Sequence, residues 1–131
     1  MKPLTIGIIG AGRIGKLHAV NLITRVKGAK LKTVTDPFLD EKWAVSKGIT
    51  VTGKDHRTIL EDKEIDAVLI CSPSPKHAEQ IIECAQVGKH IFCEKPIALD
   101  PVVILNSLSE VEKANVKLQV GFNRRFDPSF V

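Results

Sequence analysis

Short apolar runs alternate with amphipathic segments along the chain, and this alternation constrains the fold more than any other feature. Six runs are rich in the residues that favour β-strands. They are LTIGIIG, AKLKTVTD, ITVT, DAVLICS, HIFC and VKLQVGF. Strands that alternate with helices form parallel sheets through right-handed crossovers. The sequence therefore predicts an α/β fold, a doubly wound parallel sheet of six strands with helices on both faces.

The segments between the strands carry apolar residues at helical spacing. Four of them are expected to be helical: IGKLHAVNLITRVKG, FLDEKWAVSKG, a weak helix in HRTILED, and PKHAEQIIECAQVG. A glycine at the end of three of these segments is a stop signal. A further helix is predicted to start at Asp100, with Pro101 at the first helical position, and to run to about Ala114.

The composition is that of one ordinary globular domain. The chain has 131 residues, of which 44% are hydrophobic and 26% are charged. The net charge of +4 comes from scattered basic residues and the aromatic content is 5%, so the charge does not imply nucleic acid, and a phosphate-bearing small molecule would suit it as well. No apolar run approaches the roughly 18 residues that span a bilayer, and no signal-peptide cleavage site follows the N-terminus. We therefore expect a cytoplasmic protein without a membrane partner.

The three cysteines have no spacing typical of a metal site or a disulfide framework. Cys71, Cys84 and Cys93 are odd in number and form no CxxC motif. We expect them to be core thiols, and no metal site is predicted.

A GxGxxG motif follows the first predicted strand and opens the first predicted helix. Gly10 permits a tight turn, Gly12 lets the backbone approach a pyrophosphate, and Gly15 lets the helix pack close to the strand. Asp36 ends the second strand roughly 20 residues after the last glycine, as this motif expects. The helix N-terminus offers free N–H groups to phosphates. The sequence therefore predicts a Rossmann domain that binds a dinucleotide.

Asp36 also bears on the choice of dinucleotide. Its carboxylate would accept hydrogen bonds from ribose hydroxyls and would repel a 2′-phosphate, which favours NAD. Lys32 and Arg13 offer positive charge, so NADP stays open as an alternative. A second interpretation is that Asp36, followed by Pro37, caps a helix.

Polar residues follow the fourth and fifth strands, where parallel sheets bind ligands. The fourth strand ends in CSPSPKH and the fifth in EKP. From the residues alone, Lys95 is equally well explained as an active-site lysine or as a charge that pairs with Glu94.

Four stretches of this chain resemble the N-terminal domain of the glucose–fructose oxidoreductase, inositol dehydrogenase and rhizopine-catabolism (Gfo/Idh/MocA) family. They are IGIIGAGRIGKLHA, DAVLICSPSPKHAE, HIFCEKPIA and VGFNRRFDPSF, and the last favours the inositol 2-dehydrogenase branch. The resemblance implies oxidation of a ring secondary alcohol to a ketone with hydride transfer to NAD or NADP. The cofactor-binding positions that it implies are Gly10, Gly12, Arg13, Ile14, Gly15, Asp36, Ser72, Pro73, Ser74, His77 and Glu94.

The resemblance also implies that Glu94 lies near the nicotinamide ribose and that Lys95 is catalytic. An ammonium within reach of the substrate hydroxyl stabilises the oxyanion that develops as the ketone forms. The bond from Lys95 to Pro96 resembles one that is cis in some relatives.

Other polar residues keep two interpretations each. His77 either supports the structure and the cofactor, by bonding to a loop carbonyl, or transfers a proton. Arg124 and Arg125 either approach the ligand or form a solvated turn. His18, His56 and His90 are expected to be structural or exposed.

The family's second domain carries a catalytic histidine and aspartate, and nothing in residues 1–131 resembles it. We therefore expect this chain to be the dinucleotide-binding fragment of an enzyme for a polyol or sugar, inactive alone and homo-oligomeric at full length. Two alternatives stay open: an NADP-dependent sugar or dihydrodiol oxidoreductase, and a stand-alone NAD-sensing module.

Overall fold

The structure, a computed structural model, describes residues 2–121 and contains one six-stranded sheet. The strand order is β3-β2-β1-β4-β5-β6, and every neighbouring pair is parallel. The strands are β1 (Leu4–Ile9), β2 (Ala29–Thr35), β3 (Val51–Gly53), β4 (Ala67–Ile70), β5 (His90–Glu94) and β6 (Leu118–Gly121). The predicted Rossmann-type sheet is therefore confirmed.

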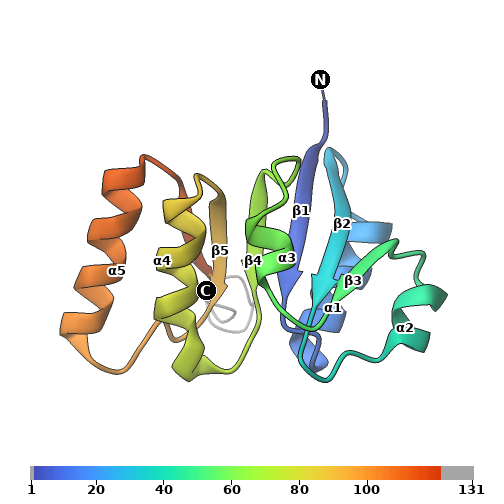
Figure 1. Ribbon diagram of the computed structural model, residues 1–131, viewed down its shortest axis with the longest axis horizontal. Helices are drawn as coiled ribbons and strands as arrows, with labels where there is room; N and C mark the ends of the chain where they lie inside the picture. Colours follow the sequence, from blue (N-terminus) through green and yellow to red (C-terminus); the bar gives the residue numbers. More distant parts are fainter. Residues whose placement is uncertain (1, 122–131) are drawn as a thin grey trace, which may run out of the picture.

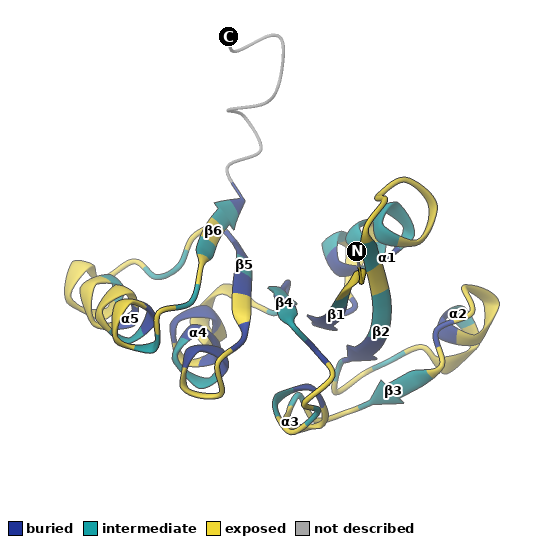
Figure 2. Ribbon diagram, turned by 90° about the horizontal axis from the view of Figure 1, so that it is seen from above, coloured by how far each residue is buried: buried dark blue, intermediate teal, exposed yellow. Residues whose placement is uncertain are grey.

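Helices cover both faces of the sheet, as predicted (Figure 1). They are α1 (Arg13–Thr24), α2 (Glu41–Ser46), α3 (Arg57–Leu60), α4 (His77–Gln86) and α5 (Pro101–Ala114), with a short 3₁₀ turn at Ser74–Lys76 before α4. Seen from above, α3, α4 and α5 lie on one side of the sheet and α1 lies on the other (Figure 2). No helix in residues 2–121 has the length and apolarity that a membrane crossing requires.

Each face of the sheet has its own buried core. One core lies under α4 and α5 and includes Val68, Ile81 and Val111. The other lies between β1, β2 and the helices α1 and α2, and it includes Ile8 and Val34. The central strands are covered on both faces, so apolar side chains are favoured on both. This explains why these strands appear in the sequence as nearly continuous apolar runs.

The strand order reverses between β1 and β4, which are direct neighbours. The chain leaves β1 toward α1 on one face and leaves β4 toward α4 on the other (Figure 2). Such a reversal opens a crevice outside the carboxyl ends of the two strands. The fold thus places the predicted ligand-binding segments at one edge.

Two helix boundaries differ from the prediction. Helix α1 ends at Thr24, before Gly28, whose carbonyl accepts a hydrogen bond from Leu4 N in the turn into β2. Helix α2 starts at Glu41 because Asp40 is its cap and accepts from Trp43 N at 3.1 Å. The strong start signal before α5 is confirmed, since the Asp100 carboxylate accepts from the amide of the second helical residue.

Candidate functional site

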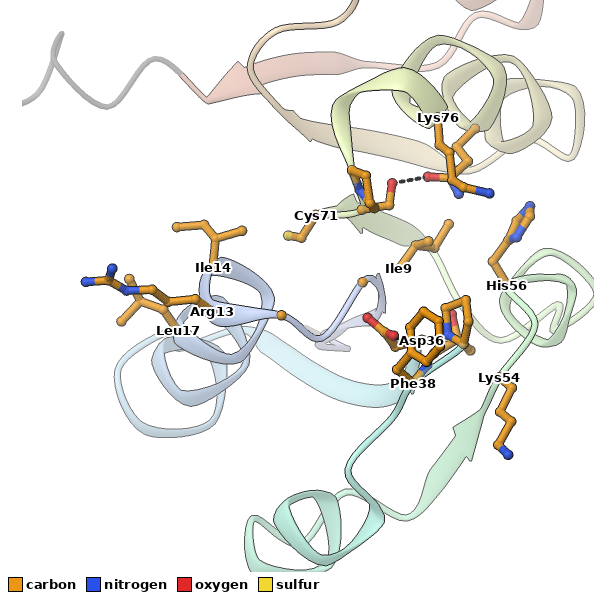
Figure 3. A pocket seen from close by; sticks show the side chains of 17 residues that line it. Ile9, Arg13, Ile14, Leu17, Asp36, Phe38, Lys54, His56, Cys71 and Lys76 are labelled. Atoms are coloured by element: carbon orange, nitrogen blue, oxygen red, sulfur yellow. Dashed lines mark hydrogen bonds between the residues drawn. The ribbon is translucent and has the colours of Figure 1, made fainter.

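A cavity of about 740 Å³ lies at the carboxyl ends of β1, β2 and β4 (Figure 3). Its walls come from the glycine turn, the end of β2, the loop after β3, and the segment from β4 into α4. The lining residues are Ile9, Gly10, Gly12, Arg13, Ile14, Leu17, Thr35, Asp36, Pro37, Phe38, Lys54, His56, Cys71, Ser72, Pro73, Lys76 and Gln80. Of the predicted cofactor positions, seven are in this set and Gly15, Ser74, His77 and Glu94 are not.

Gly10 and Gly15 let the backbone of the turn pack closely. Gly10 has φ +101°, and a Cβ there would lie 2.6 Å from the carbonyl of Cys71 and from Ser72 N. A Cβ on Gly15 would collide with the carbonyl oxygen of Gly10. No other residue type fits these two positions without moving β4 or α1.

Gly12 differs from them, because the space beside it is open. A Cβ on Gly12 would have no described protein atom within 4 Å. Gly12 is the N-cap of α1 and lines the cavity, so free amides of the first helical turn face a space that a ligand can fill. This geometry fits a pyrophosphate.

The Asp36 carboxylate points toward the glycine turn (Figure 3). Its Oδ2 accepts from Ala11 N at 2.7 Å, and its Oδ1 accepts from Phe38 N at 2.8 Å. Each oxygen keeps a second lone pair for a ligand hydroxyl. The interpretation of Asp36 as a helix cap is wrong, because Asp40 caps α2.

The mouth of the cavity is electropositive. Arg13, Lys54 and Lys76 line it and are exposed, and none of the three forms an ion pair with a residue in the described range 2–121. Within residues 2–121, Asp36 is the only carboxylate that lines the cavity. Three cations around one carboxylate suit a ligand with a net negative charge, such as a dinucleotide.

The end of β4 is tied to α4 by side-chain hydrogen bonds. The Ser72 hydroxyl donates to Oε1 of Gln80, a buried residue that also lines the cavity. Ser74, in contrast, is exposed outside the cavity wall.

His77 joins the ends of β4 and β5. Its ring is fully buried, with Nε2 2.6 Å from the carbonyl oxygen of Ser72 and Nδ1 2.8 Å from that of Pro96. Both ring nitrogens are therefore engaged by backbone, as in the structural interpretation. This arrangement lets His77 position the two loops beside the cavity.

The end of β5 has a different partner from the one expected. Glu94 is buried and its Oε1 lies 2.6 Å from Nε2 of His18, on α1. Lys95 is exposed and forms no ion pair with a described residue, so the alternative interpretation, in which Lys95 pairs with Glu94, is wrong. The bond from Lys95 to Pro96 is cis, as the resemblance implied.

The three cysteines are free and buried, as predicted. Burial raises the pKa of each thiol, of Cys71, Cys84 and Cys93, to about 12. Cys71 lines the cavity, but it stays protonated near neutral pH and does not supply a nucleophile there. Residues 2–121 contain no group of three His, Cys, Asp or Glu side chains that could hold a metal ion.

A family model described as "Oxidoreductase family, NAD-binding Rossmann fold" matches residues 4–122. The chain belongs to the Gfo/Idh/MocA family. This match confirms both the resemblance found in the sequence and the prediction of an NAD-binding Rossmann domain.

Three relatives illustrate the similarity. The chain is 48% identical over 131 residues to the uncharacterized oxidoreductase YrbE of Bacillus subtilis and 41% identical over 129 residues to the myo-inositol 2-dehydrogenase of Thermotoga maritima. It superposes with a TM-score of 0.90 and 40% identity on scyllo-inositol dehydrogenase from Lactobacillus casei, solved with NAD(H) and scyllo-inositol. These alignments cover 97–98% of this chain but 38% of each relative.

Several cavity residues of this Gfo/Idh/MocA domain were missed in the sequence. Phe38, Lys54, His56 and Gln80 line the cavity but belong to none of the motifs, and Lys76 lies in the stretch after the fourth strand but was not among the predicted site residues. The sequence did offer a signal for Lys54 and Lys76. Each follows the carboxyl end of a strand, and ligands bind outside these ends in open parallel sheets. Gln80 had none, because it lies on a helix. Arg124 and Arg125 lie outside the described residues.

Proposed function

We propose that this Gfo/Idh/MocA domain binds NAD across the carboxyl edge of its sheet, as the cofactor half of a dehydrogenase for a cyclic polyol of the inositol class. The observation that carries the proposal is the pairing of an open glycine with a carboxylate. Gly12 leaves space at the start of α1, and Asp36 lies beside the same turn, hydrogen-bonded to Ala11 N. A diphosphate and a neighbouring ribose fit this arrangement.

The proposed binding mode assigns each part of the ligand to described residues. Amides of Gly12, Arg13 and Ile14 hold the pyrophosphate, and Asp36 accepts from the adenosine ribose hydroxyls. The nicotinamide half then extends along the edge toward β4 and β5. Ser72 and Lys95 lie at those two strand ends.

The bound nicotinamide would accept hydride from the carbinol carbon of the substrate. Lys95 is the group of this chain that would stabilise the oxygen of that carbinol as its proton leaves. Its exposure and the lack of an ion pair with any described residue leave its ammonium available. His77 would hold the loop that carries Lys95, through its contact with the Pro96 carbonyl.

The substrate class is supported by the names of the relatives, several of which are inositol 2-dehydrogenases. This chain spans 38% of the first two relatives, and the family's catalytic histidine and aspartate are expected in a second domain. We expect residues 1–131 to bind dinucleotide without robust turnover of inositol. A cytoplasmic location and a homo-oligomeric full-length enzyme stay predictions.

Use of NADP is a second candidate because of one observation. Lys54 lines the cavity after β3, the strand next to β2 and Asp36, and it forms no ion pair with a described residue. An ammonium at this position would attract a 2′-phosphate, against the repulsion from Asp36.

Calorimetric titration of residues 1–131 with NAD and with NADP tests the proposal. We expect tighter binding of NAD, and a loss of about 10- to 100-fold in NAD affinity in Asp36→Ala, because hydrogen bonds to a charged group are lost. Asp66→Ala is the matched control, since Asp66 also accepts a backbone N–H, from Thr5, but at the amino edge of the sheet. Absence of binding by the unsubstituted chain, or an unchanged NAD preference in Asp36→Ala, would contradict the proposal.

A further inference from the structure

The contact between His18 and Glu94 joins two elements at the carboxyl edge of the sheet that are far apart in the sequence. His18 lies on α1, the helix that opens at the glycine turn, and Glu94 is the last residue of β5. Their side chains meet at 2.6 Å across 76 positions of sequence. The ring of His18 also packs edge-on against Phe92, with centroids 5.5 Å apart. His18 thus contacts two side chains on one face of β5.

Helix α1 makes this contact a rigid link. Gly12 to Ile14, at its first turn, line the cavity, and His18 stands about one turn further along the same helix. Helix α1 has 12 residues, and its backbone hydrogen bonds keep residues one turn apart at a fixed distance from each other. The position of the glycine turn therefore sets the position of the His18 ring, and the His18 ring in turn sets the position of the Glu94 carboxylate.

Glu94 has little freedom to find another partner. Glu94 is only 8% exposed. Strand β6 lies close to one side of its carboxylate, since a Cβ on Gly121 would lie 3.3 Å from both carboxylate oxygens. Among the described residues, His18 is the only titratable side chain that forms a hydrogen bond or ion pair with it. Without His18, a buried carboxylate would lose its partner, and the turn that follows it would have to shift.

We infer that His18 is a positioning residue that holds Glu94 and the following Lys95–Pro96 turn at a fixed position relative to the glycine turn. This inference rests on the proposed function, in which the nicotinamide half of NAD lies at the ends of β4 and β5. Seating the pyrophosphate on α1 then aligns Lys95 with the nicotinamide through the His18–Glu94 pair. His18 itself does not line the cavity.

The test compares NAD with ADP-ribose, which lacks only the nicotinamide. The ratio of the Kd for ADP-ribose to the Kd for NAD isolates the binding of the nicotinamide ring, and calorimetry of residues 1–131 gives both constants. We expect a ratio well above one in the unsubstituted chain and a fall of about tenfold in His18→Ala, with the Kd for ADP-ribose nearly unchanged. A merely structural role would weaken both ligands alike and leave the ratio intact.

Matched variants separate positioning from general damage. In His18→Gln the carboxamide still donates to Glu94 and should restore most of the ratio, whereas in His18→Asn the shorter side chain cannot reach and should behave as His18→Ala. If His18→Ala does not fold, the comparison of the Gln and Asn variants decides the question. His90→Ala, at the exposed amino end of β5, is the control and should keep the ratio.

A double-mutant cycle shows whether His18 acts through Glu94. We expect Glu94→Ala to lower the ratio and the addition of His18→Ala to lower it no further. An unchanged ratio in both His18→Ala and His18→Asn, or additive losses in the double variant, would overturn the inference while NAD binding stands. A ratio of one in the unsubstituted chain would also overturn it, and binding of neither ligand would overturn the proposed function as well.

Discussion

The glycine turn after β1 and the Glu94–Pro96 turn after β5 lie at the same edge of one sheet, but they are built differently. The glycine turn is made of backbone: Gly10 and Gly15 permit close packing, and Asp36 is held by two amides. The turn after β5 is held by side chains from other elements, His18 on α1 and His77 on α4. The close packing of the glycine turn is thus encoded by its own glycines, whereas the placement of Lys95 depends on side chains from distant elements.

Gly15→Ala should have the largest effect, because it breaks the backbone-built region. The added Cβ collides with the Gly10 carbonyl, so we expect a loss of about 3 kcal/mol in the free energy of unfolding and loss of NAD binding. Urea titration and calorimetry measure the two effects.

Gly12→Ala is the matched control for this prediction. Its Cβ meets open space, so stability should fall by only about 1 kcal/mol or less, while NAD affinity falls steeply. Equal destabilisation by the two substitutions would show that the turn is not built as described.

His77→Leu should have the next largest effect, because it loosens the region built by side chains. The His77 ring lies between the buried carbonyls of Ser72 and Pro96, and the carbonyl that accepts its ring N–H would lose that donor, which should lower the free energy of unfolding by about 1–3 kcal/mol. NAD affinity should fall less than in Gly12→Ala. His90→Leu, at an exposed position where the ring accepts a hydrogen bond from Lys117 N, should lower stability by about 1 kcal/mol or less. Matching losses at the two histidines would contradict the bridging role of His77.

The raised pKa values of the three cysteines predict that the free energy of unfolding of the domain falls at alkaline pH. Their pKa is raised from 9.0 to about 12 in the fold, so between these values the unfolded thiols lose protons that the folded ones keep. The native state then binds more protons, and each thiol should lower the free energy of unfolding by about 1.4 kcal/mol per pH unit in that window. Lys89 opposes this, because burial lowers its pKa.

Urea titrations from pH 8 to 10 measure this slope. Cys71→Ala, in the cavity wall, and Cys93→Ala, beside Glu94, should each reduce it by a similar amount. A slope that stays the same in both variants would mean that the thiols are not its source.

Lys95→Ala should have the smallest effect on the fold, which sharpens the contrast between the two regions. The side chain is exposed and unpaired with any described residue, so stability should change by about 0.5 kcal/mol or less and NAD affinity by less than about threefold. In a longer polypeptide that turns over inositol, kcat should fall about 100-fold or more with little change in the KM for NAD. Unchanged kcat would remove Lys95 from the chemistry.

The sequence by itself determined the elements and the dinucleotide turn. The alternation of strands and helices, the glycine spacing, Asp36 and the Asp100 start signal are all local patterns, because a strand, a turn or a cap is decided by residues a few positions apart. Helix ends were predicted less well, since the cap of α2 is Asp40 and not Asp36, the aspartate that was considered for that role.

Only the tertiary structure decided which side chains meet at the ends of β4 and β5. Nothing in the sequence around Glu94 indicates that its partner is His18 and not the adjacent Lys95, since the two residues are brought together by the crossovers of the sheet. The same holds for His77 between two loop carbonyls and for Gln80 under Ser72. Such contacts depend on how helices pack across the strands, and although the packed faces leave an apolar periodicity along the chain, the pairing of particular polar side chains leaves none.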